Sequence, residues 1–174
     1  MRTLRLSLTG TVILIVLGGL SGVAVAQDEV ADPMAPAAVT GKAQSYSLES
    51  PGTTSSCGDQ TCIDGVRSAN SWDASDTRLT GEVTYIGNWR EYPGAGFQVE
   101  GATRVLENDG GRWVGTATAL VGDGLNSDTI VLHGQDAYEG LTAYILMDWA
   151  TEPATFVGAI FAGELPQFPE PPTD

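Results

Sequence analysis

Alternation between apolar and polar side chains dominates the middle of this 174-residue chain. In residues 79–89, the side chains of Val83, Tyr85 and Trp89 share one parity, and polar side chains occupy most of the other. Residues 97–106 repeat this period of two. Such alternation is typical of a β-strand with one face buried. The middle of the chain is therefore predicted to form a sheet.

Turn signals divide the rest of the chain into segments of similar length. Asn-Asp-Gly-Gly at residues 108–111 is a composition that accepts the positive φ values of a tight turn. No window shows helical periodicity. Strands are expected over residues 44–49, 79–89, 97–106, 112–121, 129–134, 141–149 and 155–163. We therefore predict an all-β fold, a closed or nearly closed antiparallel barrel of about 7–8 strands. A two-sheet β-sandwich is the alternative.

Glycines inside the strand patterns favour the barrel. Gly81, Gly101, Gly115 and Gly158 all fall within predicted strands. Glycine weakens a flat strand, and it is found there where the strand bends sharply or another backbone comes close. A small barrel needs such positions.

The first 26 residues have the pattern of a cleaved export signal. Arg2 and Arg5 precede an apolar run over residues 6–20, and Ala24-Val25-Ala26 provides small residues before the predicted cut. The run is shorter than the roughly 20 apolar residues of a membrane-spanning helix, although a retained anchor remains the alternative. The mature protein is predicted to be secreted or extracytoplasmic.

Three further segments are expected beyond this signal. Residues 27–42 are acidic and contain two prolines, so we predict a disordered spacer. Residues 166–174 form a proline-rich tail. Between them, residues 43–165 have the length of a single domain with one core.

Charge disfavours two classes of partner. The formal net charge is −14, and loss of residues 1–26 removes two arginines but no acidic residue. The chain has no cluster of Lys and Arg that could displace counterions from phosphates. We therefore expect no nucleic-acid partner and no membrane association after the signal is removed.

Cys57 and Cys62 enclose only four residues. In an exported protein, two cysteines this close most simply form a local disulfide. A redox pair usually has two residues between its cysteines, and a metal site would need two further ligands that the sequence does not provide.

Large aromatic residues on the apolar parities are the predicted lining of the barrel lumen. They either pack solid or enclose a small apolar ligand, because an eight-stranded barrel is just wide enough for one or the other. Glu82 and Glu100 lie on the opposite parities and are expected outside, in solvent. The candidates for the lumen are Tyr85, Trp89, Phe97, Trp113 and Trp149.

No catalytic residue, cofactor site or metal site is predicted. His133 is the only histidine, and no Gly-x-Ser-x-Gly motif in the mature chain could supply a nucleophile, so we interpret it as a surface or hydrogen-bonded histidine. The oxygen-rich segments at residues 72–76 and 123–128 lack the spacing of an EF-hand.

The last two strands break the alternation. Apolar side chains occupy both parities there, and a strand that is apolar on both faces is usually covered on both. We hypothesise a contact surface that is covered by another subunit, in a homo-oligomer, or by the protein's own termini. Its residues are Tyr144, Leu146, Val157 and Phe161.

Four blocks, at residues 76–81, 107–116, 137–144 and 158–161, together resemble a group of uncharacterised exported bacterial β-barrel proteins. The segment Gly134–Leu141 is also similar to strand junctions in allene oxide cyclase-like and dirigent-like barrels. These resemblances imply a fold and no catalytic residue, since fold analogy does not supply function.

The sequence thus predicts an exported β-barrel domain that binds or assembles rather than catalyses. Binding of a small apolar ligand and a structural or interaction role are the two leading hypotheses. The alternative is a cofactor-free isomerase or cyclase that uses the barrel lumen. It would require a buried carboxylate, or His133, facing a pocket with a perturbed pKa.

Overall fold

The computed structural model describes residues 32–167 and 169. The predicted signal peptide over residues 1–26 and most of the proline-rich tail lie outside these residues. Nine strands and one 3-10 turn make up the described chain. They are β1 (Ala37–Ser50), β2 (Thr53–Cys57), β3 (Gln60–Ala74), η1 (Thr77–Leu79), β4 (Gly81–Tyr92), β5 (Phe97–Asn108), β6 (Gly111–Gly122), β7 (Leu125–Asp136), β8 (Leu141–Asp148) and β9 (Ala154–Ala162).

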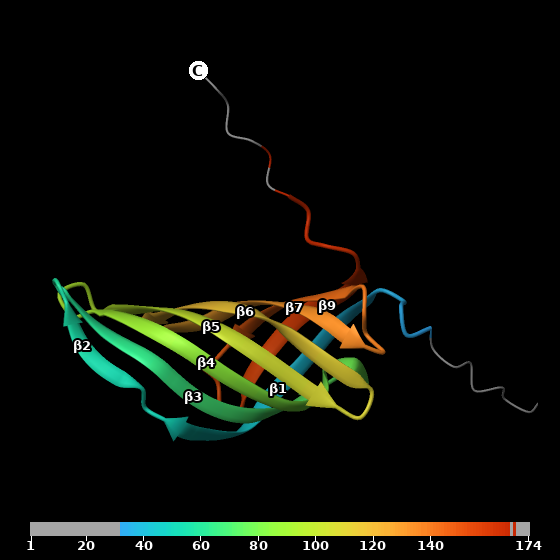
Figure 1. The fold of residues 1–174 in the computed structure, drawn as a ribbon, viewed down its shortest axis with the longest axis horizontal. Coiled ribbons are helices and arrows are strands. Elements are labelled where there is room, and N and C mark those ends of the chain that lie inside the picture. The colour runs from blue at the N-terminus through green and yellow to red at the C-terminus, as the bar shows by residue number, and fades with distance from the viewer. Residues whose placement is uncertain (1–31, 168, 170–174) are drawn as a thin grey trace, which may run out of the picture. The chain divides into compact units, whose positions relative to one another are not determined.

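Eight of these strands form an antiparallel ring, in the order β1-β9-β8-β7-β6-β5-β4-β3 and back to β1 (Figure 1). β2 continues β1 after a short break and pairs with β3. The seam between β1 and β9 is short, running from the pair Ala37 and Ile160 to the pair Ala43 and Ala154. The fold is a nearly closed barrel, which confirms the predicted all-β class.

The barrel begins earlier than the sequence analysis placed it. Residues 37–42, predicted as the end of a disordered spacer, are the first half of β1 and pair with β9. Val39 points into the core and is only 1% exposed. This part of the predicted spacer contains small apolar residues and no acid, so it can form an inner row of the barrel. The prediction was wrong there.

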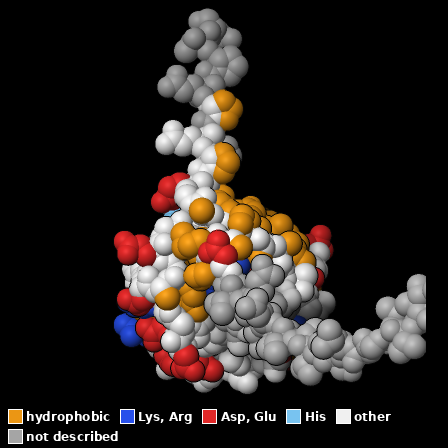
Figure 2. Space-filling view, turned by 90° about the vertical axis from the view of Figure 1, so that its right-hand side faces the viewer, with side chains coloured by type: hydrophobic (Ala, Val, Ile, Leu, Met, Phe, Trp, Pro, Cys, Tyr) orange, Lys and Arg blue, Asp and Glu red, His pale blue; other side chains and the backbone are white. Residues whose placement is uncertain are grey.

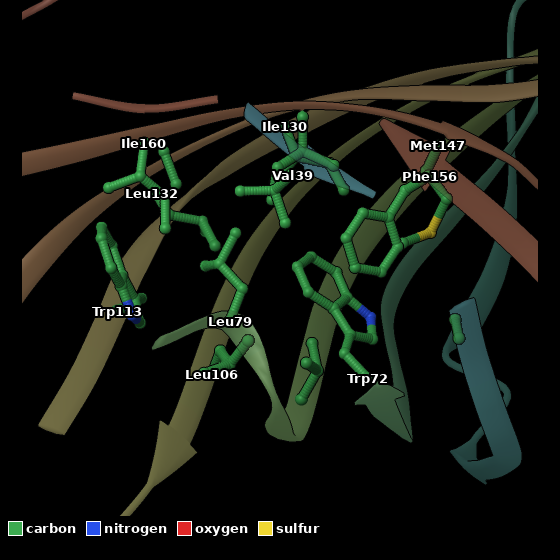
Figure 3. Packing of buried hydrophobic residues seen from close by; sticks show 14 of the residues in the cluster. Val39, Trp72, Leu79, Leu106, Trp113, Ile130, Leu132, Met147, Phe156 and Ile160 are labelled. Carbon is green, nitrogen blue, oxygen red and sulfur yellow. The ribbon is translucent and has the colours of Figure 1, made fainter. Parts of the chain in front are cut away.

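One end of the barrel is filled by an apolar core (Figure 3). Leu79, carried by η1, is fully buried and lies across this end. Trp113 is also fully buried, stacks on Tyr138 with ring centroids 5.1 Å apart, and donates its Nε1 hydrogen to the Arg78 carbonyl at 2.8 Å. We call this the closed end. Its other large side chains include Leu106, Ile130, Leu132, Leu141, Ile145 and Ile160.

Asn108 joins the turns at the closed end. Its amide nitrogen donates to the carbonyls of Arg78 and Thr80, at 3.1 and 2.9 Å. Its amide oxygen accepts from the Gly111 N–H and, at 2.9 Å, from the Tyr138 hydroxyl. These bonds satisfy turn groups that the sheet leaves without partners.

Three of the four glycines within strands are explained by close approach. A Cβ atom at Gly115 would clash with the carbonyl oxygen of Val131 on the next strand, and Gly81 and Gly158 likewise face backbone carbonyls. Gly101 differs, because a Cβ there would meet nothing within 4 Å. The inference that glycines permit close packing therefore holds for three positions and not for Gly101.

Cys57 and Cys62 face each other across the β2–β3 hairpin at disulfide-bonding distance, with Cα atoms 6.0 Å apart, as the sequence predicts. Within residues 32–167, the structure contains no helix of the length and apolarity needed to cross a bilayer.

Candidate functional site

A cavity of about 370 Å³ occupies the end of the barrel opposite the closed end. We call this end the mouth. Side chains of the inner rows of β3, β4, β5, β6 and β7 line the cavity together with the middle of β1 and the β8–β9 connection. Its lining includes Tyr46, Ser68, Asn70, Tyr85, Trp89, Glu100, Arg104, Val121, Asn126, Asp128 and Trp149.

The cavity opens where β1 leaves β9. Pairing between these strands ends at Ala43 and Ala154, and the register of β1 against β3 shifts between Gln44 and Ser47. Ser45 lies inside this bulge with φ 57°, in the left-handed region that a non-glycine residue rarely adopts. A β-bulge bends its strand and re-aims neighbouring side chains, and bulges are frequent next to functional sites. The bulge thus produces the gap at the mouth.

A buried ion pair forms the floor of the cavity. Arg104 on β5 donates through Nη2 to the Oδ2 atom of Asp128 on β7, and both side chains are only 3% exposed. The guanidinium lies between two aromatic rings, with its carbon 5.2 Å from the Tyr85 centroid and 5.7 Å from the Trp149 centroid. Trp149 also donates its Nε1 hydrogen to Asp128 at 3.2 Å. Arg104 is therefore fixed by charge and by stacking.

Small residues lie beside these groups on the neighbouring strands. Gly115 is the register partner of Arg104 on β6, and Ala119 is the partner of Asp128. On β4, a Cβ atom at Gly87 would clash with the ring and hydroxyl of Tyr85. A side chain at Gly87 would therefore compete with Tyr85 for the same volume.

A chain of hydrogen bonds surrounds a second carboxylate at the mouth. The Tyr85 hydroxyl donates to Glu100 Oε2 at 3.0 Å and accepts from Trp89 Nε1 at 2.7 Å. Gln98 Nε2 donates to Glu100 Oε1 at 2.5 Å. Burial raises the pKa of Glu100 above its usual range, while the hydrogen bonds from Tyr85 and Gln98 oppose that shift. Burial likewise raises the pKa of the Tyr85 phenol.

Several buried polar atoms at the cavity have no partner among residues 32–167 and 169. Arg104 Nε and Nη1 donate to nothing, and Asn70 Oδ1 accepts from nothing. Asn70 is 2% exposed. Burial lowers the pKa of Arg104, and the negative charge of Asp128 opposes this. An unmade hydrogen bond at a buried polar group costs about 1–3 kcal/mol, and more for a charged one.

The predicted lumen residues separate into three groups. Tyr85, Trp89 and Trp149 line the cavity, whereas Trp113 belongs to the core of the closed end. The placement of Phe97 was wrong. Its side chain is 36% exposed, does not line the cavity, and stacks on Tyr92 with centroids 4.6 Å apart.

The prediction that Glu100 lies outside the barrel was also wrong. Both errors have one cause: the parity of β5 that was expected to face outward faces inward. On β5 the inner parity carries Glu100, Arg104 and Leu106, so the polar parity faces inward near the mouth. A signal for this was present in the sequence. The turn at residues 109–110 pairs Leu106 with Trp113, so an inward Trp113 requires an inward Leu106 and therefore an inward Arg104.

His133 lies on the outer face of β7, away from the cavity. Its Nδ1 atom is 3.6 Å from Glu164 Oε2, and its side chain is 49% exposed. In the described part of the chain, no group of three or more His, Cys, Asp or Glu side chains is placed to hold a metal ion.

The predicted contact surface is on the outside of β8 and β9. Leu146 and Val157 are register partners and are 47% and 54% exposed. Tyr144 and Phe161 lie on the same outer face and are partly buried. Figure 2 views the barrel from the closed end. It shows hydrophobic side chains gathered below the base of the C-terminal segment and acidic side chains mostly along the left and lower-left edge of the view. Phe168, a predicted cover for this surface, lies outside the described residues.

Comparisons with protein-family models, with curated proteins and with solved structures give no significant match to this chain. The resemblance to exported bacterial barrels therefore stays a prediction, and the function has to be argued from the geometry of the cavity.

Proposed function

We propose that this protein is an exported binding protein that holds a small molecule in the cavity at the mouth of its barrel. The observation that carries the proposal is the buried Arg104 guanidinium, whose Nε and Nη1 groups lack acceptors beside a cavity of about 370 Å³. Arg104 is one of the residues that line this cavity, so a ligand held there lies beside these groups. Ligand pockets usually measure about 300–1,000 Å³ and combine apolar walls with a few polar groups.

The ligand has an apolar part and a polar part. Trp89 and Trp149 supply aromatic walls, and Tyr46 lies edge-on to Trp149 with centroids 6.3 Å apart. Arg104 and Asn70 supply hydrogen-bonding groups at the floor. The apolar ligand expected from the sequence is thereby narrowed to one that also carries a hydrogen-bonding group.

The predicted export is compatible with this role. The pattern of residues 1–26 predicts export, and the Cys57–Cys62 pair suits an oxidising compartment. An exported binding protein would meet its ligand outside the cytoplasm.

Native mass spectrometry of the protein secreted by its own host tests the proposal. We expect a bound molecule whose mass disappears on denaturation. Val121→Trp, which fills the lining of the cavity, should abolish it. The matched control is Val114→Trp, on the outer parity of the same strand. Retention of the molecule in Val121→Trp, or its equal loss from both variants, would contradict the proposal.

A cofactor-free isomerase or cyclase is the second candidate. Glu100 comes closest to the condition set for it, because it is a partly buried carboxylate that lines the cavity and has a raised pKa. In this role Glu100 would take a proton from carbon next to a carbonyl held by Arg104. Incubating the co-purified molecule with protein in D2O should then give deuterium at that carbon, and Glu100→Gln should stop the exchange. Equal exchange with both proteins would eliminate this candidate.

Self-association through the outer surface of β8 and β9 is a separate proposal. Leu146 and Val157 lie side by side and expose about half of their side chains. Leu146→Asp should convert an oligomer to a monomer in sedimentation velocity experiments. A wild-type protein that is monomeric at high concentration would remove this proposal.

A further inference from the structure

The polar groups without partners at the cavity are of opposite kinds. Arg104 Nε and Nη1 are donors, and Asn70 Oδ1 is an acceptor. Both residues line the same cavity, and both are at least 97% buried. A ligand that satisfies the floor of this cavity must therefore accept hydrogen bonds and also donate one.

Most simple polar groups fail one of these two requirements. A carboxylate accepts from Arg104 but has no hydrogen to donate to Asn70 Oδ1, and it adds negative charge beside Asp128 and near Glu100. An ammonium group donates to Asn70 but lies next to the Arg104 guanidinium. A carbonyl accepts only. A hydroxyl group both donates and accepts without bringing charge.

Charge balance at the floor of the cavity also indicates an uncharged ligand. Asp128 already neutralises Arg104, so the floor has no net charge left for a charged ligand to complement. A charged ligand would lose its hydration without a counter-ion, which is costly in a buried site. The ligand is therefore neutral.

The walls indicate the shape of the ligand. Trp89 and Trp149 present aromatic surface at the cavity, and their own N–H groups are already used, in bonds to Tyr85 and Asp128. Their faces are free for apolar C–H surface. A cavity of about 370 Å³ is at the small end of ligand pockets, which suits a single ring.

We infer that the ligand is a neutral ring carrying several hydroxyl groups, such as a monosaccharide or an inositol. This inference rests on the proposed binding function. One hydroxyl accepts from Arg104 and donates to Asn70, a neighbouring hydroxyl reaches the second donor of Arg104, and the C–H face of the ring lies against tryptophan.

Saturation-transfer NMR with the mature protein tests the class of ligand. The probes are glucose, galactose, N-acetylglucosamine and myo-inositol, compared with cyclohexanecarboxylate, cyclohexylammonium and the neutral apolar dye N-phenyl-1-naphthylamine. We expect saturable binding of at least one of the hydroxylated rings, and no comparable binding of the two charged cyclohexanes.

Asn70→Leu separates recognition from folding. It removes an acceptor that has no partner in the free protein, so the melting temperature should not fall, whereas affinity for the hydroxylated ring should drop at least tenfold. Thr84→Val, on the exposed outer face of β4, is the matched control and should leave affinity unchanged.

Three results would overturn the inference in distinguishable ways. Binding of the dye or of cyclohexanecarboxylate alone, lost in Val121→Trp, would refute the hydroxylated ring and leave the binding function intact. Binding of no probe, together with no co-purifying molecule in native mass spectrometry, would refute both. Equal affinities of Asn70→Leu and Thr84→Val for a sugar would refute the role of Asn70 and, with it, the argument for a hydroxyl.

Discussion

Replacing the two members of the buried ion pair, singly and together, tests whether the barrel keeps the pair for stability or for its ligand. Arg104→Met would leave Asp128 buried without a counter-charge, and Asp128→Leu would do the same to Arg104. Removing one member of a buried pair usually costs about 3–5 kcal/mol. Each single variant should therefore lose about that much unfolding free energy.

The double variant should behave differently. Exchanging a whole buried pair for apolar side chains of similar volume is often neutral or stabilising by about 1–4 kcal/mol. Two losses oppose this gain. Trp149 Nε1 loses its acceptor, which destabilises the double variant by about 1–3 kcal/mol, and the loss of the stacking of Arg104 on Tyr85 destabilises it by about 0.5–2 kcal/mol. We therefore expect the double variant to lie within about 2 kcal/mol of the wild type. The coupling energy should be at least about 4 kcal/mol.

Urea unfolding followed by tryptophan fluorescence measures these differences. The pair formed by Arg112 and Glu107 on the outer face is the internal control. Its atoms are 3.1 Å apart and its side chains are 44% and 66% exposed. Exposed pairs contribute about 0–1 kcal/mol, so the same cycle there should give a coupling no larger than that.

A double variant that loses as much stability as the two single variants together would refute this reasoning. The pair would then be part of the framework of the barrel, and its free donors would need no ligand to explain them. A stable double variant that no longer holds the co-purified molecule would support the binding proposal.

Three further changes test other parts of the structure. Gly87→Ala forces a Cβ atom against the Tyr85 ring and should lower the unfolding free energy by about 1–3 kcal/mol in thermal unfolding. Gly101→Ala is the control and should be neutral or slightly stabilising, and equal effects of the two variants would contradict the packing of Tyr85. The raised pKa of Glu100 favours its protonated form in the fold, so its contribution to stability is complete below the unfolded value of about 4.3 and is lost as the pH rises through the raised pKa. Glu100→Gln should therefore be the more stable protein at neutral pH, and urea midpoints that change with pH identically in both proteins would argue against a perturbed pKa at the partly buried Glu100. Leu79→Ala should cost about 2–5 kcal/mol by opening a void at the closed end, while Leu165→Ala, at an exposed position, should cost under about 0.5 kcal/mol in the same chemical denaturation.

The sequence was sufficient to predict the barrel because alternation and turn chemistry are local. Residues 79–89 and 97–106 alternate, and the Asn-Asp-Gly-Gly turn between β5 and β6 is where it was expected. The Cys57–Cys62 pair was predicted for the same reason, since only four residues separate the two cysteines.

The cavity could not be found by asking which parity is more apolar. Period-two alternation identifies two faces, and the rule that the apolar face is inside fails where the interior itself is polar. On β5 the inner row changes from Leu106 to Arg104 and Glu100 within six residues. Phe97, one of the more hydrophobic residues of that strand, consequently lies outside. Only the register fixed by the turn to Trp113 distinguishes the two faces.

Four sequence blocks carry the resemblance to exported bacterial barrels, and their position in the fold explains why that resemblance bears on the fold alone. Residues 76–81, 107–116, 137–144 and 158–161 supply η1, the turns and much of the core at the closed end. None of the residues that line the cavity falls within them. A resemblance carried by these blocks can indicate how the closed end of the barrel is packed. It cannot indicate which ligand the cavity binds.

The short seam between β1 and β9 has a consequence for association as well as for binding. In the described part of the chain, β1 beyond Ala43 and all of β2 are hydrogen-bonded to a strand on one side only, that of β3. Such an edge offers free N–H and C=O groups to any other extended chain, which is a common route to aggregation. The bulge at Ser45 and the break at Pro51 interrupt this row of groups, so no long, straight template is exposed. A deletion that straightened β1 would therefore close the entrance to the cavity and at the same time leave the barrel prone to stacking edge to edge.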